Sequence, residues 1–118
     1  MLISLSKPQI QAALCCPPTG AGIPLTSQAI ADLATRLKAI ADPVRLRLLT
    51  HLLDQPDFES CTCILAPVVN LSEPTVSHHL KKLEASGLLT KERRGMSVFY
   101  RVVPESIHSI ASALHFKC

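Results

Sequence analysis

The stretch from Leu71 to Leu89 constrains the fold most, because it indicates a helix with a marked start, one buried side and a marked end. Ser72 is a good N-cap, and Pro74 suits the first helical turn. Apolar residues recur at the spacing of one helical stripe: Val76, Leu80 and Leu83. Gly87 then stops the helix. The pattern predicts a helix that buries one face and leaves the other outside.

The outer face of this helix carries hydroxyl groups and an imidazole near its start, and two cations further along. Its polar residues are Ser72, Thr75, Ser77, His78, Lys81 and Lys82. Such groups can hydrogen-bond to base edges and phosphates together. The face therefore predicts a DNA-binding surface, although a solvated helix with a capped start has the same pattern. Of His78 and His79, we expect one to meet DNA and the other to pack.

A cationic hairpin follows this helix. Residues 88–92 and 97–102 alternate as strands, and Gly95 supplies the awkward dihedral in the tip over residues 93–96. The hairpin carries three cations: Lys91, Arg93 and Arg94. Beside a DNA-reading helix, a cationic hairpin is typical of a wing that lies against the phosphate backbone or in the minor groove. The alternative is a charged hairpin edge that resists aggregation.

Two helices are expected before these elements. Thr26 or Ser27 can cap the first, and Asp42 followed by Pro43 starts the second. The first has an apolar stripe of Ile30, Leu33, Ala34, Leu37 and Ile40 or Ala41. The second has a buried side of Val44, Leu46, Leu48, Leu49, Leu52 and Leu53. This periodicity predicts two helices of a compact bundle.

A third, short helix is expected to begin near Ser60 and to contain Cys61 and Cys63, with Pro67 removing one backbone donor from it. With the tight turn and the exposed helix that follow, it makes a helix-turn-helix. An amphipathic helix over residues 104–116 closes the chain. The predicted fold is mainly α with a small β-hairpin, a winged helix-turn-helix of the ααααββα kind.

Composition allows a single domain and is compatible with a dimer. Of the 118 residues 47% are hydrophobic, but only 3% are aromatic, which limits the area that one chain can bury. The net charge of +3 permits a nucleic-acid partner. No apolar run is long enough to span a membrane, and the start has no basic region typical of a signal peptide, so we expect a cytoplasmic protein. We expect no enzyme, since no phosphate-cradling loop accompanies a lone reactive cysteine.

Two segments carry a family resemblance. Residues 37–49 (LKAIADPVRLRLL) and residues 71–83 (LSEPTVSHHLKKL) resemble the signature segments of the ArsR/SmtB family of metalloregulatory winged-helix repressors. Cys61 and Cys63 fall where many members carry a Cys-x-Cys box. The match covers roughly residues 27–114. The resemblance implies a homodimer built from the first and last helices, which binds a palindromic operator and leaves it when an inducer binds.

Four thiols in two pairs form the candidate inducer site: Cys15, Cys16, Cys61 and Cys63. Residues i and i+2 of a regular helix point about 200° apart. Cys61 and Cys63 therefore cannot easily share one ion inside a helix, but they could at a frayed helix start, where the helix dipole makes a thiol more acidic. Prolines and glycines surround Cys15 and Cys16, so residues 1–25 are expected to form a flexible arm. Residues 26–118 are expected to form the DNA-binding and dimerisation domain.

Thiolates favour soft ions. An arm folded over the third helix, in our expectation that of the partner subunit, would join Cys15 and Cys16 with Cys63 or Cys61 in a three-thiolate site. Three thiolates suit trivalent arsenic or antimony, and four would suit cadmium, lead or zinc. Both arrangements occur in the family that the chain resembles. We favour arsenite or antimonite as the inducer, because neighbouring cysteines suit a pyramidal centre.

Other interpretations of the cysteines stay open. A reversible bridge between two of them would make a redox or persulfide sensor on the same fold, and small buried or idle cysteines are the plainest alternative.

Some members of the resembling family carry a zinc site on the last helix. That site is not reproduced here by Glu105, His108 and His115, so we expect none there. Cys118 is expected to be idle, because chain ends are usually poorly ordered, and the alternative is a stray ligand.

Overall fold

The computed structural model describes residues 25–114. Its elements are α2 (Ser27–Ile40), α3 (Pro43–Leu53), the 3-10 turn η2 (Pro56–Phe58), β1 (Glu59–Cys61), α4 (Thr62–Val69), α5 (Glu73–Ala85), β2 (Leu89–Arg94), β3 (Ser97–Val102) and α6 (Pro104–Ala113). This order confirms the predicted winged helix-turn-helix. The predicted arm with Cys15 and Cys16 lies outside the described residues, except for Leu25, and so does Cys118.

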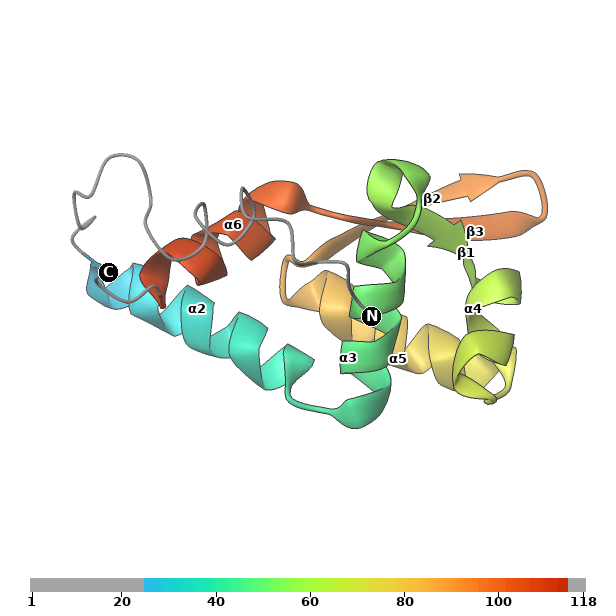
Figure 1. Cartoon of the computed structure of the whole chain (residues 1–118), viewed down its shortest axis with the longest axis horizontal. Coiled ribbons are helices and arrows are strands. Elements are labelled where there is room, and N and C mark those ends of the chain that lie inside the picture. Colours follow the sequence, from blue (N-terminus) through green and yellow to red (C-terminus); the bar gives the residue numbers. More distant parts are fainter. Residues whose placement is uncertain (1–24, 115–118) are drawn as a thin grey trace.

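The elements separate into two ends (Figure 1). Helices α2 and α6 lie at one end, and the β2–β3 hairpin and α4 lie at the other. In the middle, α3 and α5 enclose the core together with α4 and one face of the sheet. The fully buried core side chains are Leu48, Leu52, Leu65, Val76, Leu80, Leu83, Leu88, Leu89, Tyr100 and Val102. None of the helices between residues 25 and 114 combines the length and the apolar character that a membrane span requires.

The caps confirm two predicted helix starts. The Thr26 hydroxyl accepts a hydrogen bond from the backbone N–H of Ala29 at 3.0 Å. The Asp42 carboxylate accepts two, from the N–H groups of Val44 and Arg45, each at 3.0 Å. These bonds satisfy donors that a helix start otherwise leaves without a partner. They also fix the corner between α2 and α3.

Asp42→Ala is expected to lower the urea midpoint of unfolding at pH 7, whereas Asp42→Asn, which keeps a capping oxygen, should stay near the wild-type value. The N–H of Arg45 holds the pKa of Asp42 below its ordinary value of 3.8. The charge-dependent part of the cap is therefore present above that ordinary pKa and is lost as pH falls through the lowered one. Urea titrations at several pH values test this, and equal midpoints for wild type and Asp42→Ala at pH 7 would contradict it.

The apolar stripe of α2 is not buried within one chain. None of its residues is buried, and Ile30 and Leu37 are 52% and 37% exposed. On α3 the predicted buried side is wrong at Leu46, which is 47% exposed. Leu46 lies four residues before exposed Thr50 and shares its outer helix face. The unburied stripe of α2 leaves an apolar surface at the end of the molecule that also carries α6.

The third helix begins two residues later than expected. Ser60 and Cys61 lie in β1, opposite Tyr100 and Phe99 of β3, and α4 starts at Thr62. Pairing with β3 holds Cys61 in an extended conformation, which overrides the local preference for a helix. The sheet therefore has three antiparallel strands in the order β1–β3–β2, where the sequence predicted a two-stranded hairpin.

The hairpin tip is also shorter than expected. Strand β2 continues to Arg94, which pairs with Ser97, so only Gly95 and Met96 form the turn. Gly95 has the positive φ of +63° that the turn requires. Arg93 and Arg94 are thus strand residues, and their side chains point to opposite faces of the hairpin.

Helix α6 ends at Ala113, short of the predicted end.

Candidate nucleic-acid interface and thiol pair

Helix α5 presents a fixed outer face. Its inner residues Val76, Leu80 and Leu83 are fully buried, as predicted. At its start the Ser72 hydroxyl accepts the N–H of Thr75 at 3.3 Å, which confirms the predicted cap. The buried stripe sets the rotation of the helix, so the opposite side chains can point only outward.

A tight turn joins α4 to α5. Asn70 ends α4 in the left-handed conformation with φ of +57°, and its N–H reaches the carbonyl groups of Ala66 and Pro67. The N–H of Leu71 bonds to the Ala66 carbonyl at 3.2 Å. These bonds cap the C-terminus of α4, and asparagine tolerates this backbone conformation well. The turn sets the angle at which α5 leaves α4.

The predicted DNA-binding residues lie on α5 and the hairpin, and all but one of them are exposed. The exposed ones are Ser72, Thr75, His78, Lys81, Lys82, Lys91, Arg93 and Arg94. Ser77 is half-buried and hydrogen-bonds to the Tyr100 hydroxyl, whose pKa is raised above its ordinary value by burial and by Glu84. Ser77 is thus placed less well than its neighbours to reach a base.

The two histidines of α5 have different surroundings. His78 is exposed, whereas His79 is half-buried, with its Nδ1 atom 3.2 Å from Nη1 of Arg45. Arg45 also donates from Nε to the carbonyl of Ala39 at 2.6 Å. Arg45 therefore links the corner between α2 and α3 to helix α5. Sequence reasoning missed this role, because Arg45 and His79 are 34 residues apart and no local pattern joins them.

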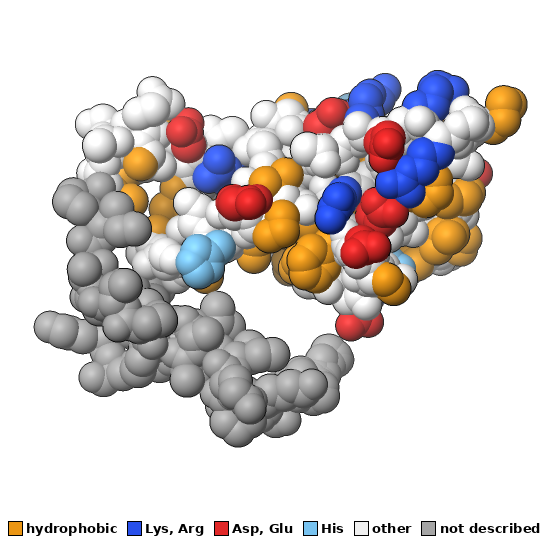
Figure 2. All heavy atoms as spheres, turned by 90° about the horizontal axis from the view of Figure 1, so that it is seen from above, with side chains coloured by type: hydrophobic (Ala, Val, Ile, Leu, Met, Phe, Trp, Pro, Cys, Tyr) orange, Lys and Arg blue, Asp and Glu red, His pale blue; other side chains and the backbone are white. Residues whose placement is uncertain are grey.

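Charged groups of both signs gather at the hairpin end. Figure 2 shows lysine and arginine side chains interspersed with acidic ones there. Within residues 25–114, no hydrogen bond or ion pair engages the Lys91 or Arg93 side chain. These two cations are therefore available to a partner of opposite charge.

Arg94, by contrast, is held by two carboxylates. Its Nη1 and Nη2 atoms lie 2.8 and 3.0 Å from the two carboxylate oxygens of Glu59. Its Nη2 and Nε atoms lie 2.7 and 3.0 Å from Oε1 of Glu92. Its guanidinium carbon lies 4.4 Å from the centre of the Phe99 ring. The hydrogen bonds from Arg94 hold the pKa of Glu59 below its ordinary value.

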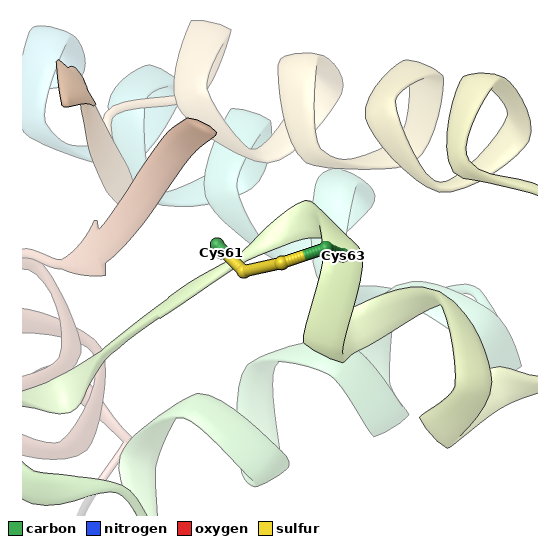
Figure 3. The surroundings of a disulfide bond; sticks show 2 residues. All are labelled: Cys61 and Cys63. Carbon is green, nitrogen blue, oxygen red and sulfur yellow. A yellow bond between two sulfur atoms is a disulfide. The ribbon is translucent and has the colours of Figure 1, made fainter. Parts of the chain in front are cut away.

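The thiol pair lies at the junction of β1 and α4. Cys61 and Cys63 form a disulfide there, with their Cα atoms 5.3 Å apart (Figure 3). Cys61 is 3% exposed, whereas Cys63 is exposed. Inside a helix the side chains of residues 61 and 63 would point in nearly opposite directions. Cys61 is instead extended, so the two sulfur atoms can meet. Among the described residues, no group of three or more histidine, cysteine or acidic side chains is placed to hold a metal ion.

Comparisons with known proteins agree on one family. The family model "Bacterial regulatory protein, arsR family" matches residues 42–91. The arsenic resistance transcriptional regulator ArsR1 of Pseudomonas putida is 40% identical over 68 residues, which cover 58% of this chain and 52% of that protein. The arsenical resistance operon repressor of Staphylococcus xylosus is 35% identical over 79 residues, which cover 67% of this chain and 73% of that protein.

A solved structure gives the same result. The homodimeric winged helix-turn-helix DNA-binding domain from Mycobacterium bovis superposes with a TM-score of 0.61 at 27% identity, covering 77% of this chain and 86% of that chain. The chain spans about half the length of the P. putida relative that it matches. The family model nevertheless covers the whole helix-turn-helix, and the solved structure shares its fold. The chain therefore belongs to the ArsR family of bacterial regulatory proteins, a family of transcriptional regulators and not of enzymes.

Proposed function

We propose that this chain is a homodimeric repressor that binds operator DNA and releases it when trivalent arsenic or antimony binds to its cysteine thiolates. The observation that carries the proposal is the meeting of Cys61 and Cys63 at the start of α4, the helix directly before α5. A ligand held there acts next to the turn that sets the direction of α5.

The outer face of α5 is the proposed reading surface. Thr75 and His78 are exposed on it and would contact base edges, with Ser72 at its start and Ser77 at its margin. Lys81 and Lys82 further along the helix, with Lys91 and Arg93 on the wing, would hold phosphates. Arg94 completes the cations of the wing, although its charge is already matched by two carboxylates.

A second copy of the chain is the proposed cover for α2. Its apolar stripe is left open by this chain, and Leu114, next to the end of α6, is 54% exposed. Both helices lie at the end opposite the wing (Figure 1). Pairing two copies through this end would leave two reading helices to enter successive major grooves, about 34 Å apart. The domain from Mycobacterium bovis, which is homodimeric, supports the pairing of two copies.

The proposed inducer site joins the thiol pair to the N-terminal segment. Cys15 and Cys16 would supply two thiolates, and Cys63 is the preferred third because it is exposed, whereas Cys61 is buried. Three thiolates suit trivalent arsenic or antimony. Recruiting Cys61 as well would suit cadmium, lead or zinc. The disulfide form cannot serve as ligand, so a reductant must first supply two electrons and two protons to the pair.

Operator binding titrated with arsenite under reducing conditions tests the proposal. Arsenite should weaken operator binding by the wild-type chain about 5- to 150-fold, the usual range for coupled sites. Cys15→Ser/Cys16→Ser should bind DNA normally and lose the release. Cys118→Ser is the matched control and should keep it. Normal release by the double variant would contradict the role of Cys15 and Cys16. X-ray absorption of the arsenite-loaded protein would distinguish three sulfur ligands from four.

A redox sensor on the same fold is the second candidate function, and the Cys61–Cys63 disulfide favours it. Here peroxide would accept two electrons and two protons from the two thiols, giving the disulfide and two molecules of water. Oxidation would then release DNA without any metalloid, and Cys61→Ser/Cys63→Ser would be insensitive to peroxide. Release by peroxide but not by arsenite would decide for this candidate.

A further inference from the structure

We propose that Arg94 is a positioning residue that couples the thiol pair to the wing through Glu59, and that it does not act mainly as a phosphate contact. The inference rests on the proposed function and adds the route by which the thiols reach the DNA-binding surface. It is carried by the geometry across one face of the sheet, where Arg94 on β2 contacts Phe99 on the central strand β3 and Glu59 on β1.

The contacts of Arg94 explain why it differs from its neighbour Arg93. Two parallel N–H donors of Arg94 meet both carboxylate oxygens of Glu59, the arrangement that fixes a guanidinium most firmly. Glu92 adds two more contacts, so the charge of Arg94 is already compensated. Arg93 points to the other face of the hairpin and has no such partner among the described residues.

The same contacts lead directly to Cys61. Glu59 begins the three-residue strand β1, and Cys61 ends it. Cys61 pairs with Phe99 on β3, and the guanidinium of Arg94 lies over the Phe99 ring. Arg94 therefore contacts both the residue two positions before Cys61 and the residue opposite it.

This arrangement makes the wing sensitive to the state of the thiols. Cys61 is buried at the end of a short edge strand, and its sulfur is bonded to Cys63 while β1 stays paired with β3. Reduction of that bond, and ligation of either freed thiolate, therefore changes the constraint that Cys63 places on Cys61 and on β1. Glu59 moves with β1 and carries the Arg94 guanidinium with it. Because Arg94 is the last residue of β2, the turn and Arg93 beside it shift with respect to α5.

Glu59→Gln tests the link, because the coupling and simple electrostatics predict different results. Removing an acidic group near DNA should by itself leave operator binding unchanged or slightly tighter. Arsenite should weaken operator binding by the wild type about 5- to 150-fold. If the coupling holds, arsenite should weaken operator binding by Glu59→Gln less than about twofold. A direct titration should show that this variant still binds arsenite. Arg94→Lys, which keeps the charge but loses the fork, should lose release in the same way.

Arg93→Gln is the matched control on the same strand. It should weaken DNA binding with and without arsenite by the same factor, and should lower the salt dependence by about one unit per protomer. Met96 provides a second readout, because it is 96% exposed at the turn and Met1 is the only other methionine in the sequence. Its methyl NMR signal should shift with arsenite in the wild type and stay in place in Glu59→Gln.

Each outcome separates the two proposals. Wild-type release by Glu59→Gln and Arg94→Lys would overturn the coupling and leave the proposed function intact. If arsenite fails to release the wild type from the operator, the proposed function is contradicted. The operator affinities of the same variants are then compared between the reduced and the peroxide-oxidised state. An operator affinity that is equal in those two states would then overturn the coupling as well.

Discussion

Lys81→Gln/Lys82→Gln is expected to bind operator DNA about a thousandfold more weakly than the wild type near 0.15 M salt. Both lysines are exposed on the outer face of α5, whose rotation is fixed by the buried stripe beneath it. Each phosphate contact contributes about 0.9 to the slope of the logarithm of affinity against the logarithm of salt concentration. In a dimer the two substitutions remove four contacts, so the slope should fall by about 3.6.

Fluorescence anisotropy with a labelled operator over a series of salt concentrations measures both quantities. Lys38→Gln removes a cation from α2, away from the outer face of α5, and should leave the slope near the wild-type value. A double variant at positions 81 and 82 that keeps the wild-type slope would show that these lysines are merely solvated. The far-UV circular dichroism of the variants should match the wild type, since both side chains are exposed.

Local patterns were enough to predict the elements that form the helix-turn-helix. The caps at Thr26, Asp42 and Ser72 each depend on a side chain that bonds within three residues, so the sequence contains the whole interaction. The buried stripe of α5 follows in the same way from periodicity. These features place the polar face of α5 outward without knowledge of any distant contact.

The features that the sequence did not predict depend on distant partners. Strand β1 has only three residues, too few for any periodicity, and it forms because β3 pairs with it about forty positions later. The Glu59–Arg94 pair and the Arg45–His79 contact span 35 and 34 residues. The stripe of α2 was predicted correctly as apolar, but a single chain offers no surface to cover it.

The thiol pair shows both kinds of feature. The spacing of Cys61 and Cys63 indicated that they could meet only if the helix were irregular at its start. The irregularity itself comes from β1, because extended Cys61 is the last strand residue and also the N-cap position of α4. Helix geometry therefore predicted that an irregular helix start was needed, and the pairing of β1 with β3 provides it.

Leu80→Ala is expected to lower the free energy of unfolding by about 2–5 kcal/mol, a change of roughly 30- to 4,000-fold in the folding equilibrium. Leu80 is fully buried in the middle of α5, in the core that α3, α4 and the sheet share. Truncation loses the transfer free energy of the removed atoms and leaves a cavity beneath the reading helix. Far-UV circular dichroism in urea measures the change, since the sequence has no tryptophan and a single tyrosine.

Two further variants show whether packing causes this loss. Leu80→Met keeps most of the volume and should cost less than about 1.5 kcal/mol. Ile64→Ala makes a comparable truncation on α4, where the side chain is 55% exposed, and should change stability by no more than about 0.5 kcal/mol. All titrations need one protein concentration, because the unfolding of a dimer depends on it. Equal losses for Leu80→Ala and Ile64→Ala would mean that α5 is not held by the core, and the fixed orientation of its reading face would lose its physical basis.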